Sequence, residues 1–357
     1  MEKESIFNYT IQDLQDILIE NGFKKFSAQQ VFDWLYVKLE TDFNNMTNLS
    51  KKLKEFLIDK FNTLLLSDLT IKESKDGTIK ILFMLDDKKT IETVLMPQKY
   101  GQSVCVTTQV GCKMACTFCA SGLIKTERNL TVDEIVRQVF FMNKLLKEKF
   151  KNDLNNPKAR ISHIVIMGIG EPMDNFDNVI KFIKIVNDPL GFGIGARHIT
   201  VSTCGIVPKI KQFADLNIQV NLAISLHAPN DELRNQLMPI NKVFNIEKLI
   251  DAIKYYIGVT NRRVTFEYIL IEDTNDLPDH AEQLARLIRG INSYVNLIPY
   301  NEVEENPFKK SLKINQFYKI LKGLGINAIV RKEFGSDINA ACGQLRAKRE
   351  GVIKNDF

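Results

Sequence analysis

The sequence lacks any apolar run long enough to cross a membrane. No stretch approaches about 18 uninterrupted apolar residues, and the first residues, MEKESIFNYT, carry acidic side chains where a secretory signal would have its apolar core. Low-complexity segments and internal repeats are also missing. We therefore expect a soluble globular protein that stays in the cytoplasm and does not associate with membranes.

Histidine and cysteine are scarce, and the cysteines are unevenly placed. The chain has four histidines and six cysteines. Three of the cysteines, Cys112, Cys116 and Cys119, fall within the string GCKMACTFCASG, with no histidine near them in sequence. Because thiols are kept reduced in the cytoplasm, such a cluster indicates metal ligands or redox catalysts rather than structural disulfides.

Three closely spaced thiolates suit an iron–sulfur cluster in which one iron atom has no protein ligand. A closed zinc site normally takes four ligands in two separated pairs, which this loop does not supply. Zinc and redox-active thiols remain as alternatives at this stage.

Acidic residues are missing from one long stretch. The net charge is only +5, but residues 306–332 contain seven Lys or Arg and no Asp or Glu. Such a run is typical either of a solvated helix face or of a patch that faces phosphate groups. The seven residues are Lys309, Lys310, Lys313, Lys319, Lys322, Arg331 and Lys332.

Hydrophobic periodicity divides the chain into a helical part and a larger α/β part. Residues 1–65 show helical spacing, with a capping-box pattern at Ser27 and Gln30 ahead of the second helix, and residues 66–98 form short β-rich runs that link the two parts. From 99 to 345, strand-like runs alternate with amphipathic segments, one of them opened by the capping box Thr131 to Glu134. The remainder, 346–357, is expected to be a tail. The strands are expected at 103–108, 161–167, 198–202, 218–226, 263–270 and 294–299.

Six β/α units predict a parallel sheet, either doubly wound or curled into a partial barrel. A barrel gathers its catalytic groups at the carboxyl ends of the strands, and the unusual polar residues of this chain follow the expected strands there. They are the three clustered cysteines, Gly170 and Glu171 in the string GIGEP, Ser202, Ser225, His227 and Asn301.

The spacing CxxxCxxC, with Phe118 before the last cysteine, resembles the signature of the radical S-adenosylmethionine enzymes. In that superfamily three cysteines bind a 4Fe–4S cluster, whose open iron is chelated by S-adenosylmethionine before the cofactor is cleaved to a 5′-deoxyadenosyl radical. The resemblance implies a partial (β/α)6 barrel. The glycines of GIGEP would let the backbone approach the methionine end of the cofactor, and Glu171 could accept a hydrogen bond from its ammonium group.

Longer strings narrow the resemblance to one family. GCKMACTFCASG, MGIGEP, NLAISLHAPNDELRNQLMPIN, RRVTFEYIL, NLIPYN and DINAACGQL occur in this order and closely resemble the dual-specificity 23S ribosomal RNA and transfer RNA adenine-C2 methyltransferases. The likeness covers about residues 90 to 345 and extends more weakly to the helical region.

The resemblance implies a radical reaction that uses two molecules of S-adenosylmethionine per turnover. Carbon 2 of adenine is electron-poor and does not attack a sulfonium methyl group. In the family, one molecule methylates a cysteine, here matching Cys342, and the other yields the radical that takes hydrogen from this S-methyl group. The methylene radical adds to adenine, Glu92 matches the general base, and Cys105 matches the cysteine that releases the product by forming a disulfide with Cys342.

The family match also implies cofactor contacts and partners. The substrates are an adenosine in the peptidyl-transferase centre of 23S ribosomal RNA and one 3′ of the anticodon in transfer RNA, so residues 1–65 are expected to bind RNA. An electron donor such as a flavodoxin or ferredoxin is expected, as is a monomeric state. The implied cofactor-binding residues are Gly170, Glu171, Ser202, Ser225, Leu226, His227 and Asn301.

The sequence departs from the family pattern at two positions and leaves two other functions open. Glu302 stands where a proline is usual, and Asn339 where an aspartate is usual. The sister enzymes that methylate carbon 8 of the same ribosomal adenosine share the cysteines but tend to have alanine at the position of Pro172. A non-catalytic RNA-binding protein would hold structural zinc instead. Cys204 matches no role and is expected to be structural.

Overall fold

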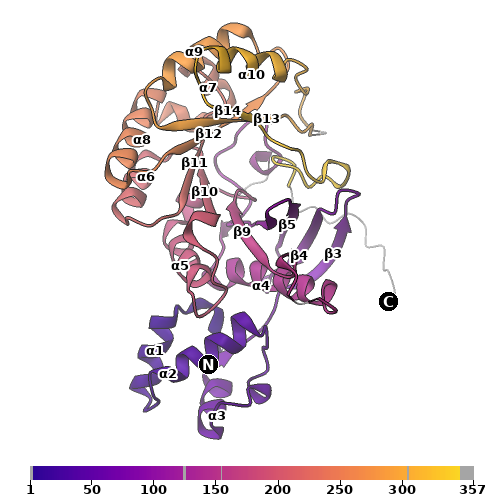
Figure 1. Ribbon diagram of the computed structural model, residues 1–357, viewed down its shortest axis with the longest axis vertical. Coiled ribbons are helices and arrows are strands. Elements are labelled where there is room, and N and C mark those ends of the chain that lie inside the picture. The colour runs from indigo at the N-terminus through magenta and orange to yellow at the C-terminus, as the bar shows by residue number, and fades with distance from the viewer. Residues whose placement is uncertain (1–2, 124–125, 154, 304, 346–357) are drawn as a thin grey trace.

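The computed structural model describes residues 3–123, 126–153, 155–303 and 305–345, so the expected tail lies outside the described residues. A sheet of ten strands forms the body of the molecule (Figure 1), in the order β14-β13-β12-β11-β10-β9-β6-β5-β4-β3. Neighbouring strands are parallel from β6 to β14 and antiparallel from β3 to β6.

The parallel part contains the six strands expected from the sequence, and a short seventh strand, β14, that the sequence analysis missed. The seven are β6 (Gly101–Cys105), β9 (Ile161–Ile166), β10 (Ile199–Thr203), β11 (Asn221–Ser225), β12 (Val264–Leu270), β13 (Ser293–Pro299) and β14 (Ala328–Val330).

Helices follow these strands along the chain and cover the outer face of the curved sheet (Figure 1). This is the predicted partial barrel. The capping box at the start of α4 is confirmed, because the backbone N–H of Thr131 donates to Glu134 at 2.9 Å. The helices are α4 (Val132–Lys149), α5 (Phe176–Asn187), α6 (Val207–Asp215), α7 (Asp231–Leu237), α8 (Ile246–Thr260), α9 (Pro278–Ile288) and α10 (Ile314–Gly323).

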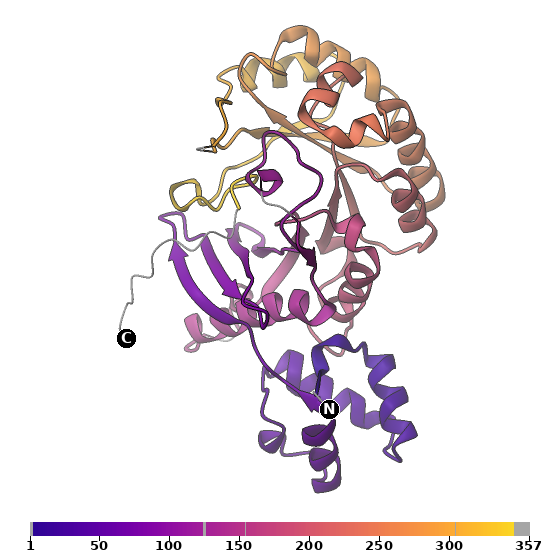
Figure 2. The same ribbon diagram turned by 180° about the vertical axis from the view of Figure 1, so that it is seen from behind.

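The β-rich runs do more than connect two domains. They form β3 (Ser67–Glu73), β4 (Ile79–Met84) and β5 (Thr90–Gln98), and β5 pairs with the first barrel strand. Figure 2 shows these strands beside the barrel. The sheet therefore runs without a break from the β-rich segment into the barrel.

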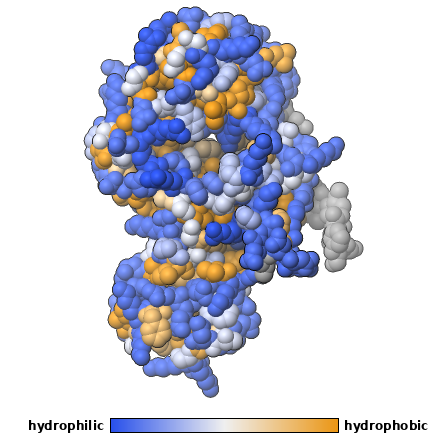
Figure 3. Space-filling model, in the orientation of Figure 1, coloured by the Kyte–Doolittle hydropathy of each residue, from blue (hydrophilic) through white to orange (hydrophobic). Residues whose placement is uncertain are grey.

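The first part of the chain is helical, as expected, with α1 (Ile11–Glu20), α2 (Phe26–Phe32), α3 (Lys51–Lys60) and the short parallel pair β1 (Glu4–Ser5) and β2 (Phe61–Asn62). It packs on the barrel through aromatic rings, with Phe7 at 5.3 Å from Phe140 and Tyr36 at 4.9 Å from Phe192. The surface is mostly hydrophilic and narrows between the two parts (Figure 3). Among the described residues, no helix could span a membrane.

One local prediction was wrong. The pattern of Ser27 and Gln30 does not cap a helix, because α2 already begins at Phe26 and Ser27 is buried inside its first turn. The residue before the helix, Lys25, has helical backbone angles and no capping side chain.

Candidate active site

The three clustered cysteines lie on one loop at the carboxyl end of the first barrel strands. The loop begins after β7 (Gln109–Val110) and ends in a short turn at residues 120–123. Cys112, Cys116 and Cys119 all line one cavity inside the barrel, which we call the upper cavity. Apolar side chains, including Met114 and Phe118, pack around the three thiols.

The surroundings of these thiols are dry. Burial raises the pKa of Cys112 to about 12 and raises the pKa of Cys116 and Cys119 above the usual value. The thiols are close enough for the charge of one to affect the pKa of another. Positive charge from bound iron would favour the thiolate form, since metal ligation deprotonates thiols.

The arrangement of the thiols fits a cluster better than a single zinc ion. Among the described residues, no three Cys, His, Asp or Glu side chains surround a common point at which one metal ion could sit. A 4Fe–4S cluster takes each thiolate at a different iron atom, so three thiols that line one cavity suit it. A fourth cysteine, Cys204, also lines this cavity; it is buried and follows β10 rather than lying on the loop.

The glycine-rich string after β9 forms another wall of the upper cavity. A Cβ atom on Gly168 would lie 2.7 Å from the backbone oxygen of Val106, and one on Gly170, with φ +107°, would meet Gln109 at 2.7 Å. These glycines are therefore required by the close packing of the string against the segment after β6. This packing brings the backbone of Gly170 to the cavity.

Glu171 is buried on the same wall and is held by backbone donors. Its two carboxylate oxygens accept from the N–H groups of Met173 at 3.0 Å and Cys204 at 2.8 Å. Burial raises the pKa of Glu171. The side chains of Thr203 and Cys204 also hydrogen-bond to this carboxylate, so several donors hold it at the cavity.

The ends of β10 and β11 supply hydroxyl groups and an imidazole. The hydroxyls of Ser202 and Ser225 are 3.4 Å apart and both line the upper cavity, as does His227. The backbone N–H of Ile269 donates to Nδ1 of His227 at 3.1 Å, so Nε2 carries the proton. Burial lowers the pKa of His227 to about 3, and the ring is a neutral donor. Leu226 is fully buried and does not line the cavity.

A buried arginine, which the sequence analysis did not single out, holds these strand ends in place. Arg234 donates to the carbonyl oxygens of Cys204 at 2.6 Å and Leu226 at 3.2 Å, and to the side chain of Asn241 at 2.8 Å. It lies within the string NLAISLHAPNDELRNQLMPIN. No local pattern distinguished it, because α7 reads DELRNQL and is mostly polar.

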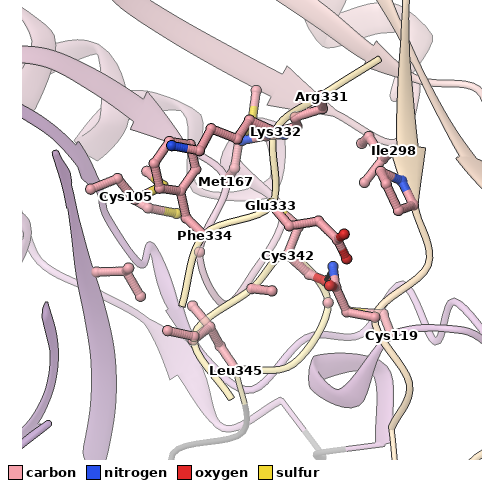
Figure 4. A pocket seen from close by; sticks show the side chains of 18 of the residues that line it. Cys105, Cys119, Met167, Ile298, Arg331, Lys332, Glu333, Phe334, Cys342 and Leu345 are labelled. Carbon is pink, nitrogen blue, oxygen red and sulfur yellow. Dashed lines mark hydrogen bonds between the residues drawn. The ribbon is translucent and has the colours of Figure 1, made fainter. Parts of the chain in front are cut away.

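Cys105 and Cys342 come together although 237 positions separate them. Both line a second, smaller cavity beside the upper one, which we call the cysteine cavity, and both thiols are free. Cys119 lines the same cavity, so Cys105 and Cys342 lie beside the loop of clustered cysteines (Figure 4). Burial raises the pKa of Cys105 to about 12, and the nearby Cys342 adds to the effect.

Hydrogen bonds fix the loop that carries Cys342. The N–H of Ala120, in the turn after Cys119, donates to Gly343 at 2.8 Å, and Ser121 donates to Leu345 at 2.8 Å. Asn301 donates to the carbonyl oxygen of Cys342 at 3.2 Å, and Asn301 lines the cysteine cavity rather than the upper one. The loop is thus attached to the clustered-cysteine loop on one side and to the end of β13 on the other.

Glu92 lies close to this cavity without lining it. It is buried on β5, on the same face as Val94 and Met96, which do line the cysteine cavity. Its carboxylate forms an ion pair with Lys80 of β4 at 2.9 Å. Val94, the next residue on that face, is the register partner of Cys105.

The basic run divides into paired and buried members. Lys309, Lys310 and Lys313 form ion pairs with Glu302 at 3.1 Å, Glu333 at 2.7 Å and Asp273 at 2.9 Å, respectively. Arg331 points into the barrel and lies 3.7 Å from Glu267. Of the two interpretations of the run, the paired lysines favour a solvated surface.

The whole chain is similar to known proteins. Residues 106–288 match the family model described as Radical SAM superfamily, and residues 5–62 match the one described as Ribosomal RNA large subunit methyltransferase N-terminal domain. The chain is 61% identical over 350 residues to the probable dual-specificity RNA methyltransferase RlmN of Spiroplasma citri, covering 98% of this chain and 99% of the relative. It is 54% identical over 362 residues to the protein of the same name from Enterococcus faecalis, covering 99% and 100%.

A solved structure has the same fold. The crystal structure of a radical SAM methyltransferase from Sphaerobacter thermophilus superposes with a TM-score of 0.90 at 42% identity, covering 97% of this chain and 100% of the other. The likeness includes the helical part, the β-rich strands and the barrel.

Proposed function

Because the chain belongs to the RlmN family of dual-specificity RNA methyltransferases, within the radical S-adenosylmethionine superfamily, we propose that it methylates carbon 2 of adenosine in 23S ribosomal RNA and in transfer RNA. The observation that carries the proposal is the convergence of Cys105, Cys342 and Cys119 on one cavity. A structural zinc protein would have no use for two further free thiols beside the metal loop.

The upper cavity is proposed to hold the cofactors. Cys112, Cys116 and Cys119 would bind the 4Fe–4S cluster, and Gly170 and Glu171 would bind the methionine end of S-adenosylmethionine. Together these groups would supply a carbon-centred radical and a transferable methyl group. The residues proposed to bind the rest of S-adenosylmethionine are Ser202, Ser225 and His227, which line this cavity, and Leu226 and Asn301, which lie beside it.

The two free cysteines are proposed to carry the methyl group and to release the product. The sulfur of Cys342 would take a methyl group and hold it within the cysteine cavity, where it can become bonded to carbon 2 of adenine. The sulfur of Cys105 would then bond to the sulfur of Cys342 as the bond from that sulfur to carbon breaks. Two molecules of S-adenosylmethionine would be used per turnover.

Glu92 is proposed to remove the proton from the adenine carbon. Its ion pair with Lys80 keeps a carboxylate beside the strand of Cys105. Since Glu92 does not line the cysteine cavity, its side chain must turn past Val94 to reach the base. A general base has to come within hydrogen-bonding distance of the proton that it removes.

One part of the surface bears on RNA binding. The helical domain, residues 1–65, exposes lysines next to aromatic rings, with Lys24 at 5.9 Å from the ring of Phe26 and Lys52 at 5.8 Å from that of Phe23. Lysines and aromatic rings together bind phosphates and unpaired bases. We propose that this domain binds RNA in the cytoplasm, that the enzyme acts as a monomer, and that a flavodoxin or ferredoxin supplies electrons.

Nucleoside analysis tests the proposal. Protein purified without oxygen would be mixed with a reductant, S-adenosylmethionine and unmodified ribosomal or transfer RNA, and the digested RNA would be analysed by mass spectrometry. We expect 2-methyladenosine together with 5′-deoxyadenosine. A methyl group on carbon 8 would contradict the proposed position, and a colourless protein that cleaves no cofactor would contradict the reaction itself.

A variant of Cys105 tests the release step. With Cys105→Ala, the link between the sulfur of Cys342 and the adenine carbon has no thiol to displace it, so RNA should stay covalently attached to the protein. Denaturing electrophoresis would show the slower band. Cys204→Ala is the matched control, and it should release the RNA as the unchanged protein does.

A further inference from the structure

A third cavity lies inside the barrel, at the amino ends of the parallel strands. Its volume is about 510 Å³, within the range of about 300 to 1,000 Å³ that is usual for ligand sites. We call it the basic cavity, because four cationic side chains line it and only one carboxylate does, that of Glu267. The four are Arg197, Arg263, Arg331 and Lys332.

The basic cavity is stacked beneath the upper cavity along the barrel. Side chains two residues apart on a strand point to the same face. On β12, Thr265 lines the basic cavity, Ile269 lines the upper one, and Glu267 between them lines both. On β13, Tyr294 lines the basic cavity and Ile298 the upper one. A ligand in the basic cavity would therefore face the cofactors from below.

The basic cavity also adjoins the two free cysteines. Met167 and Arg331 line the basic, the upper and the cysteine cavity alike. Met96, Lys332 and Phe334 are shared by the basic and cysteine cavities. The basic cavity therefore provides one approach to Cys342, through the residues that it shares with the cysteine cavity.

Two cations of this cavity have no acidic partner in the described part of the chain, whereas Arg331 lies 3.7 Å from Glu267. Among the described residues, neither Arg197 nor Arg263 forms an ion pair with a carboxylate. The guanidinium of Arg263 lies over the ring of Tyr294 at 4.8 Å, and the ammonium of Lys332 lies 4.8 Å from the ring of Phe334. An unpaired arginine on an aromatic ring, with a second unpaired arginine in the same cavity, suits a ligand that carries phosphates and a base.

Three aromatic rings are in contact with one another beside the cavity. Tyr100, which is 64% exposed and lines the cavity, lies 4.5 Å from the ring of His163, and His163 stacks on His198 at 4.3 Å and 21°. His198 follows Arg197 in the chain. An exposed tyrosine beside an arginine is the usual platform for an unstacked base of single-stranded RNA.

We propose that the basic cavity receives the target adenosine, which enters from the amino ends of the barrel strands. Arg197 and Arg263 would bind the phosphates on either side of it, and Tyr100 would stack on a neighbouring base. The adenine would pass between Met167 and Arg331 and reach Cys342 from the side opposite the upper cavity. This inference rests on the proposed function, since it concerns the substrate of the same site.

Binding and methylation measurements on three variants test the inference. The variants are Arg263→Gln, the double variant with Arg197→Gln, and Tyr100→Ala, each studied with an unmodified transfer RNA transcript at several salt concentrations. Every lost phosphate contact should reduce the slope of log affinity against log salt by ~0.7 to 0.9. Losing the stacking platform should weaken binding by about fivefold or more, and Tyr100→Phe should restore it.

One further readout and one control variant separate this role from a structural one. Methylation of Cys342 without RNA, followed by protein mass spectrometry, should be unchanged in all variants, because only the RNA site is altered. Arg289→Gln, which removes an exposed charge after α9 on the outside of the barrel, should leave RNA affinity and its salt slope unchanged.

The inference fails if the double variant and Tyr100→Ala bind RNA with unaltered affinity and salt slope while the unchanged enzyme makes 2-methyladenosine. It also fails if the variants lose methylation of Cys342 together with RNA binding, since that pattern indicates a damaged barrel. If the unchanged enzyme bound RNA and made no methyladenosine, the proposed function would be wrong, whereas RNA affinity would still report on the cavity.

Discussion

The side-chain amide of Asn301 donates a hydrogen bond to the backbone carbonyl oxygen of Cys342, with an N···O distance of 3.2 Å. It joins the segment after β13 to a residue 41 positions later along the chain. A second link runs alongside, because the amide of Gln344 donates to the carbonyl oxygen of Glu302 at 3.0 Å. The position of the thiol of Cys342 therefore depends on residues after the sixth predicted strand.

Asn301→Ala should loosen this loop and slow methyl transfer. One hydrogen bond contributes about 0.5 to 1.5 kcal/mol, so we expect kcat for RNA methylation to fall by about two- to tenfold. The iron content should be unchanged, because no clustered cysteine bonds to Asn301. Asn315→Ala, an exposed change on α10, is the control and should have no effect. An unchanged kcat in Asn301→Ala would show that the bond does not position Cys342.

Local patterns predicted the barrel well. Alternation located the six main strands, and the capping box at Thr131 and Glu134 marked the first residue of α4 correctly. Both signals depend on neighbouring residues, so the sequence contains them directly. The same kind of pattern at Ser27 failed, since tertiary packing buried this side chain inside α2.

Long-range contacts were less accessible from the sequence. The three-residue strand β14 is too short for a periodic pattern to reveal, and β6 pairs with β9, which follows only after α4 in the chain. The basic run looked unpaired because its acidic partners lie outside it, as Glu302 does for Lys309. The free cysteines were brought together by resemblance to a family, and no local pattern at Cys105 would have suggested a partner at Cys342.

Gly168→Ala should destabilise the barrel. The added Cβ would lie 2.7 Å from the hydroxyl of Thr107 and 2.7 Å from the carbonyl oxygen of Val106. Overpacking of this kind costs about 1 to 3 kcal/mol, which urea denaturation would report as a lower midpoint. Gly195→Ala is the matched control, since its Cβ meets nothing within 4 Å and its φ is −55°. Equal midpoints for the two variants would contradict the close packing of the glycine-rich string.

His227→Asn should make the protein less sensitive to acid. Burial lowers the pKa of His227 to about 3, against 6.5 for a free histidine. Between these values the unfolded chain binds a proton that the folded protein does not, so stability is lost as the pH falls below 6.5. From pH 7.5 to pH 5 this loss amounts to about 2 kcal/mol.

Asparagine does not titrate, tolerates the left-handed backbone of His227, where φ is 57°, and can accept from the N–H of Ile269. Urea denaturation of the protein without its cluster, at both pH values, should show a smaller acid loss in the variant by about 2 kcal/mol. Equal losses would mean that His227 is protonated in the folded protein.

The lysines of the helical domain should contribute more to RNA affinity than those of the basic run. In the run, Lys309, Lys310 and Lys313 are already paired with carboxylates. Replacing all three with alanine leaves their carboxylate partners unpaired. It should change little the number of counterions that are released when RNA binds. We therefore expect the salt slope of RNA affinity to stay close to that of the unchanged protein.

The matched triple variant changes Lys24, Lys25 and Lys52, which are exposed on the helical domain; Lys24 and Lys52 lie beside aromatic rings. Each phosphate contact contributes ~0.7 to 0.9 to the slope of log affinity against log salt, so the loss of three contacts should reduce the slope by about 2 to 3. Filter binding at several salt concentrations would measure both variants. If the slope fell more for the paired lysines than for the helical domain, RNA would bind across the basic run, and its ion pairs would have to open to receive the phosphates.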